Sequence, residues 1–241
     1  MSIVTIARRD LAAYLNGYSA WVIIAAVLLI EGLWFYAFNL GLDSARYSQD
    51  VITGFFETAG GCTIVLGVLL SMRSMAAEHQ AGTDKLLQSS VARDWQIIVG
   101  KFLAGFGMIG LCTVLTLHMP LLVVVHGKVS MGHLAVGYLG VLCIGAATLA
   151  IGIFSSTLFR HQLMAGAFAG VTVVFFIVVW FVADITDPPF SEVLGYSAFF
   201  NQHLIPFQQG RFVSGGLVFF ASITTVFLLL ATRILDSRRW N

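Results

Sequence analysis

Apolar residues occur along this chain in long blocks separated by short polar stretches. A helix that crosses a membrane needs about 20 mainly apolar residues. The segments that meet this condition are 19–40, 51–73, 96–126, 131–158, 162–183 and 214–235. Because lipid offers no partners to the hydrogen-bonding groups of an open sheet edge, the pattern predicts an all-α integral membrane protein with six spans. We expect residues 1–241 to form a single transmembrane domain.

Composition strengthens this prediction. The chain has 241 residues, of which 58% are hydrophobic and 10% charged, whereas a soluble domain has about a quarter charged residues. Six spans leave only short loops, so we expect no soluble catalytic domain. The first apolar block follows Arg8 and Arg9, but it is too long for the core of a signal peptide and lacks a small-residue cleavage site, so we expect a retained helix.

Positive charges are distributed unequally between the two sets of loops. With the N-terminus inside, 10 of the 13 Lys and Arg residues fall on the inner side. These are Arg8, Arg9, Arg73, Lys85, Arg93, Lys101, Arg160, Arg233, Arg238 and Arg239. The positive-inside rule therefore predicts that both termini are cytoplasmic. The net charge of +1 gives no support for binding to nucleic acid.

Residues 3–15 form an amphipathic pattern ahead of the first span. Helical spacing places Ile3, Ala7, Leu11 and Tyr14 on one face. The pattern predicts an interfacial helix with its apolar face in the headgroup region and with Arg8 and Arg9 reaching anionic lipid or an intracellular partner. The alternative is that the two arginines are only a positive flank of the first span.

Segment 184–213 is too polar for a seventh span but rich in aromatic residues. We expect an external helical hairpin that dips into the membrane without crossing it, and the alternative is an ordinary amphipathic loop. Within the spans, Pro120 predicts a kink, and Gly166 and Gly170 form a GxxxG motif that predicts close helix packing.

The three cysteines, Cys62, Cys112 and Cys143, all lie in apolar spans without CxxC spacing. We interpret them as buried small hydrophobes, and we expect no metal site.

The longest charged segment lies between the second and third spans. Gly82 allows a sharp turn, Thr83 can cap a helix, and Asp84 follows in the first turn, where the helix dipole favours an anion. Leu86 and Leu87 then have no lipid to face, so they are candidate contacts for a partner protein. The alternative is an ordinary polar loop between two spans.

This segment also carries a family resemblance. The string Glu78-x-x-x-Gly82-Thr83-x-x-x-Leu87, followed by Arg93-Asp94-Trp95 and Gly100-Lys101-Phe102-Leu103, resembles the first intracellular loop of ABC-2 type transporter permeases, closest to the gliding-motility GldF-like branch. The order of elements along nearly the whole chain is similar as well. Lys85 and Val91 depart from the family pattern, in which an acid and a proline are expected.

The resemblance implies that residues 76–92 act as a coupling helix that contacts an ABC ATPase. It assigns ATPase coupling to Glu78, Gly82, Thr83, Asp84, Leu86 and Leu87. It also implies a bacterial inner-membrane location, two ATPase chains, a second permease chain as a homodimer or related heterodimer, and contact with membrane lipid. A periplasmic accessory protein is a further possible partner.

The chain itself lacks a phosphate-binding loop. Gly100-Lys101 is followed by Phe102, and Trp95 stands where the first glycine of such a loop belongs. We therefore expect a non-catalytic subunit that binds no cofactor, with ATP and Mg on the partner ATPase.

Three ionisable residues fall inside the spans, namely Glu31, Glu57 and His118. Counting about 1.5 Å per residue places all three at a similar depth below the external surface. Such residues usually face a cavity or a partner, so we expect a water-accessible external cavity. The alternative is that Glu57 belongs to an interfacial turn and that Glu31 snorkels or bonds a neighbouring helix.

The function expected from these features is ATP-driven export of a lipid-linked, glycan, peptide or drug-like substrate. One alternative is a proton- or ion-coupled secondary transporter or channel that uses Glu31, Glu57 and His118. Another is an ABC complex that transmits force without moving a solute. An intramembrane enzyme would need a nucleophile and base at matched depth, and the scattered histidines give this class little support.

Overall fold

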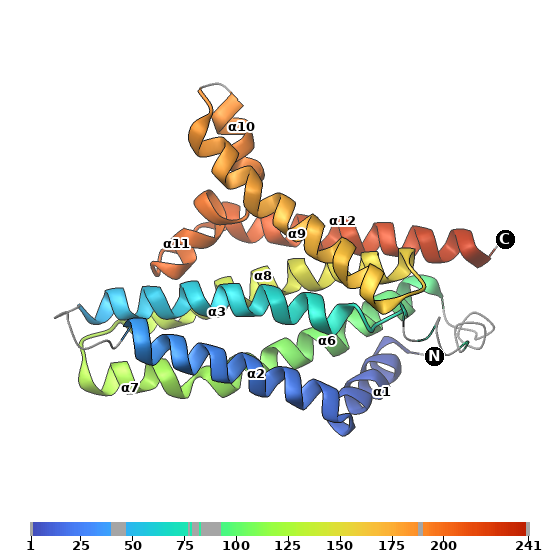
Figure 1. Cartoon of the computed structure of the whole chain (residues 1–241), viewed down its shortest axis with the longest axis horizontal. Coiled ribbons are helices and arrows are strands. Elements are labelled where there is room, and N and C mark those ends of the chain that lie inside the picture. Colours follow the sequence, from blue (N-terminus) through green and yellow to red (C-terminus); the bar gives the residue numbers. More distant parts are fainter. Residues whose placement is uncertain are drawn as a thin grey trace.

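The computed structural model describes residues 2–39, 47–76, 78, 82, 93–187 and 190–239. Within these residues the chain is helical, and six helices are long and apolar enough to cross a membrane. They are Tyr18–Phe38, Ser48–Ser71, Asp94–Val125, Met131–Leu158, Gln162–Ile185 and Ser214–Ser237. Each overlaps one predicted span, so the helical class of the described residues and the presence of six helices of membrane-spanning length are confirmed. The N- and C-terminal ends lie at the same end of the bundle (Figure 1).

Helix α8 (Met131–Leu158) is the most buried of the six spans. It packs against α3 (Ser48–Ser71), α9 (Gln162–Ile185) and α12 (Ser214–Arg239). Small residues allow the close approach of α8 to α3, since a methyl group at Gly152 would overlap Ser71 and one at Gly137 would overlap Phe56. Gly170, by contrast, has open space beside it.

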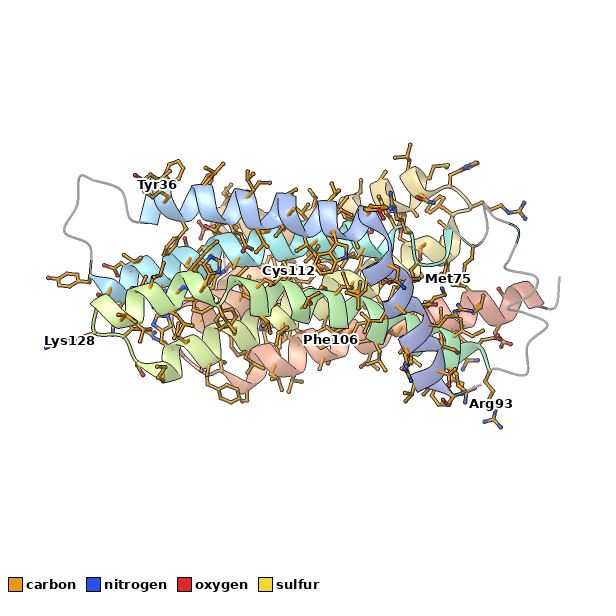
Figure 2. All side chains as sticks on the ribbon, turned by 90° about the horizontal axis from the view of Figure 1, so that it is seen from below. Tyr36, Met75, Arg93, Phe106, Cys112 and Lys128 are labelled. Carbon is orange, nitrogen blue, oxygen red and sulfur yellow. The ribbon has the colours of Figure 1, made fainter. Side chains whose placement is uncertain are left out.

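Helix α1 (Ile3–Asn16) lies across the spans at one end of the bundle, as Figure 2 shows. Ile6 is buried, and Leu11 and Tyr14 pack against the core, while Arg8 and Arg9 are not buried. Part of the apolar face packs on α6 (Asp94–Thr116) of the same chain. A helix is therefore present at Ile3–Asn16, and its interfacial placement stays a prediction.

The third span is interrupted near Pro120. Helix α6 ends at Thr116, Leu117 forms a turn, and α7 runs from His118 to His126. Proline has no N–H to donate to the carbonyl of Thr116, so the ladder of hydrogen bonds breaks within the turn that precedes it. The kink expected from the sequence is found here.

The segment between α9 and α12 contains α10 (Phe190–Ser197), the π-helical turn η2 (Phe200–Leu204) and α11 (Ile205–Gln208). Helix α10 packs on α9. The C-terminal part of α9 leans away from the other spans (Figure 1). Phe199, Leu204 and Phe207 are fully buried. Aromatic side chains thus anchor this short helical segment to the end of the bundle opposite α1.

Candidate functional site

Four charged side chains form a cluster where α1 meets the polar segment and α6. We call Arg9, Asp10, Glu78 and Lys101 the ion cluster. Lys101 is only 5% exposed, and its ammonium group donates to Asp10 Oδ2 at 3.1 Å, Glu78 Oε1 at 2.8 Å and the Ser74 carbonyl at 2.9 Å. Three stretches of chain that are distant in sequence are therefore joined through one buried cation.

Arginine extends this network at its exposed edge. One guanidinium nitrogen of Arg9 lies 2.9 Å from Asp10 and 3.4 Å from Glu78. Each carboxylate thus contacts two cations, which offsets the cost of placing charges in a partly buried site.

Tyr14 lies beside the ion cluster and donates to the Leu70 carbonyl at 3.2 Å. Burial, together with the negative charges of Asp10 and Glu78, raises the pKa of its hydroxyl to about 12, while Arg73 opposes the shift. The hydroxyl therefore remains a hydrogen-bond donor throughout the physiological range.

Gly82 lies in the segment between α3 and α6. It has a φ of +67°, in the left-handed region that glycine adopts without strain. The sharp turn expected around Gly82 stays a prediction. Thr83, Asp84, Leu86 and Leu87, the other coupling residues named from the sequence, lie outside the described residues.

A groove of about 740 Å³ runs between α2 (Tyr18–Trp34) and α3, and we call it the α2–α3 groove. It begins at Cys62 in the middle of α3 and reaches the end of the bundle opposite α1. Its lining consists of Ile30, Trp34, Phe38, Asp50, Thr53, Gly54, Glu57, Thr58, Gly61 and Cys62. Polar and small side chains of α3 thus face apolar side chains of α2 and of the π-helical turn η1 (Phe35–Asn39) that follows it.

A second, more polar basin of about 510 Å³ adjoins the groove. Asp50 and Thr53 line both spaces, and His133 and Arg211 contribute to the basin alone. The floor of the basin is fixed by buried hydrogen bonds, since the His133 ring donates to the Gln208 carbonyl at 2.7 Å. The groove and the basin therefore share a border at Asp50 and Thr53.

The three intramembrane ionisable residues have different surroundings. Glu57 is exposed in the α2–α3 groove, and His118 is exposed at the start of α7, where its ring donates to the Leu115 carbonyl at 2.8 Å. Glu31 is 3% exposed, and its Oε2 has no hydrogen-bond partner among the described residues. In the described part of the chain no three His, Cys, Asp or Glu side chains are arranged to hold a metal ion, so these residues do not gather at one point.

Glu31 lies on the same side of α2 as Cys62 of α3, Cys112 of α6 and Tyr138 of α8, within range of their electrostatic influence. Cys62 lies five residues beyond Glu57, which corresponds to about 7 Å along a helix. Glu31 is therefore associated with the interior of the bundle next to the groove, whereas Glu57 is on the groove wall.

Sequence reasoning missed Asp10 and the burial of Lys101. Lys101 was counted as a loop cation, but α6 begins at Asp94 and places it in the second turn of the helix. The burial of Lys101 could have been inferred from its position within the predicted span 96–126. A charged residue within a span needs a partner.

No known protein family matches this chain, and no curated protein matches it. The six apolar helices give it the architecture of a multi-pass membrane protein.

Proposed function

We propose that this chain is the permease subunit of an ATP-driven ABC-2 type exporter. The observation that carries the proposal is the ion cluster, because Glu78 stands within the segment that the family resemblance assigns to the ATPase. Lys101 links Glu78 to α1 and to the start of the third span at 2.8 to 3.1 Å. A force applied to segment 76–92 would therefore reach two helices of the bundle directly.

The α2–α3 groove supports the transport part of the proposal. An acidic group at the centre of a membrane helix costs about 2.5 to 3.5 kcal/mol on insertion scales, so Glu57 is expected to face water or protein. Nothing in the described part of this chain covers it. We infer that a second permease chain closes the groove and that the substrate moves along it.

The partners follow from the same proposal. Two ATPase chains bind ATP and Mg, while the two permease chains bind neither and act as non-catalytic subunits. Both termini lie at the end of the bundle that carries the ion cluster (Figure 1). This arrangement supports the proposal that this end faces the cytoplasm, in a bacterial inner membrane. A force-transmitting complex would use the same coupling and would need an external accessory protein.

Co-purification tests the proposal. The tagged chain is expressed with an ABC ATPase encoded in its genomic neighbourhood, and both recovery of the ATPase and ATP hydrolysis are measured. Leu87→Ala and Glu78→Ala should reduce both, whereas Leu163→Ala, a change at an 83% exposed leucine near the start of α9, should not. Unchanged assembly and hydrolysis in both coupling variants would refute the assignment.

Glu31 favours one alternative, a proton-coupled transporter. A buried carboxyl with an oxygen that has no partner among the described residues is a natural proton-binding group. Transport that survives ATP depletion but stops with a protonophore would favour this alternative over the exporter.

A further inference from the structure

The two walls of the α2–α3 groove differ in chemistry. Ile30, Trp34 and Phe38 present half-exposed apolar surface on one side, and α3 contributes Asp50 and Glu57 on the other. No Lys, Arg or His is among the described residues that line the groove. Its volume of about 740 Å³ lies in the range typical of sites for small organic ligands.

The aromatic wall is suited to a positive charge. The rings of Trp34 and Phe38 are stacked with centroids 4.4 Å apart, and both side chains are about half exposed. The face of an aromatic ring attracts a cation, and tryptophan does so most strongly. This attraction increases when water is excluded, as it would be inside a closed groove.

Glu57 adds a formal negative charge on the facing wall. It is exposed, and no hydrogen bond or ion pair to its carboxylate is found in the described part of the chain. A carboxylate at membrane depth is stabilised by a positive partner, and the described residues that line the groove do not provide one.

We infer that a second copy of the chain supplies no such partner where the two grooves meet across a two-fold axis. In that arrangement the same surface patch meets itself, so a groove on the axis faces the groove of the other copy. Two grooves joined in this way contain two copies of Asp50, Glu57 and Trp34. A chamber closed in this way would be negatively charged and lined with aromatic rings.

We propose that the α2–α3 groove binds amphipathic organic cations, in which apolar or aromatic groups surround a positive charge. This inference rests on the proposed function and names its substrate class. Trp34 and Phe38 contact the apolar groups, and Glu57 neutralises the charge. Arg211 lies in the adjoining basin but not in the groove, so the site for the cation ends near Asp50.

A pair of ions with the same shape and opposite charge tests the proposal. Binding of tetraphenylphosphonium and tetraphenylborate is measured by equilibrium dialysis with the dimer in lipid nanodiscs, and empty nanodiscs are subtracted. The wild-type chain should bind the phosphonium and not the borate. Glu57→Gln should weaken phosphonium binding by about tenfold, and Trp34→Leu by severalfold.

Two control variants separate the specific site from general electrostatic attraction. Glu57→Asp keeps the negative charge and should retain most of the binding. Asp184→Asn removes an exposed acid at the outer end of α9, outside the groove, and should have no effect. Equal binding of the two ions, or equal losses in Glu57→Gln and Asp184→Asn, would overturn the proposal.

The outcome can be distinguished from a failure of the proposed function. If the ATPase co-purifies and depends on Leu87 but the phosphonium does not bind through Glu57, the substrate class is wrong and the exporter remains. If binding depends on Glu57 but no ATPase associates, the cation site is correct and the exporter is wrong.

Discussion

Replacing Lys101 by Met should weaken the packing of α1 against the end of the bundle. Methionine keeps the apolar stem of the side chain but removes the ammonium group that contacts Asp10, Glu78 and the Ser74 carbonyl. Breaking a buried ion pair from one side typically costs about 3 to 5 kcal/mol, because the remaining charge loses its partner.

The expected cost here is smaller, at about 2 to 3 kcal/mol. The side chains of Asp10 and Glu78 are 14% and 19% exposed, and Arg9 remains 3.4 Å from Glu78. Water and Arg9 therefore compensate part of the lost charge. A loss of about 2 kcal/mol corresponds to an increase of about thirtyfold in the exchange rate of amides that open with α1.

Hydrogen exchange measured by mass spectrometry provides the readout. Peptides from α1 should exchange faster in Lys101→Met, while peptides from α8 should be unchanged. Lys128→Met is the matched control, since Lys128 is exposed at the opposite end of the bundle (Figure 2). Adding Glu78→Gln to Lys101→Met should restore about 1 kcal/mol, because it removes one of the two carboxylates that lose the Lys101 ammonium group. Equal exchange of α1 in the two lysine variants would refute this reasoning.

Two further predictions concern the packing of α1 and the pH response of the opposite end. Gly100→Ala should destabilise the α1–α6 contact by about 1 to 3 kcal/mol, because the added methyl would lie 2.8 Å from Ile6. Gly110→Ala is the control on the same helix, because the space beside Gly110 is open. In thermal unfolding this control should be neutral or stabilising. Burial lowers the pKa of His203, whose ring donates to the Tyr196 carbonyl at 2.9 Å. Below about pH 6.5 the unfolded state therefore binds more protons than the native state. The native state loses stability as the pH falls. The decrease in melting temperature between neutral and mildly acidic buffer should therefore be smaller in His203→Phe, and an identical decrease would contradict this assignment.

The spans could be predicted from the sequence because lipid imposes a simple requirement on length and polarity. The fourth span was predicted at 131–158, and the structure has Met131–Leu158. The break near Pro120 was predictable for an equally local reason, since it depends on one missing N–H.

The docking of α1 could not be predicted in the same way. The apolar face of α1 can be recognised in the sequence. Such a face can be buried either in a membrane surface or against another part of the protein, and the pattern does not distinguish the two. The deciding feature is the contact between Ile6 and Gly100, where the absence of a side chain allows close approach. That contact depends on the angle at which α1 crosses α6, which a single sequence does not specify.

The candidate sites were predicted only in part. Glu57 was recognised as an intramembrane acid, and Asp50, Gly54 and Gly61 lie with it on one face of α3 at helical spacing. That face could have been recognised as a polar stripe. Lys101 is buried because its side chain lies on the face of α6 that packs against α1. The positive-inside rule considers only the position of a cation along the chain, not the helix face it occupies.

The central claim is that ATP on a partner chain changes the arrangement of two permease chains. Tyr36 is 73% exposed at the end opposite α1, so a spin label there reports the distance between the two copies (Figure 2). Electron paramagnetic resonance of the labelled complex with its ATPase should show a distance distribution that shifts when ATP and Mg are added and returns after hydrolysis. A distribution that stays the same while the ATPase turns over would contradict the account.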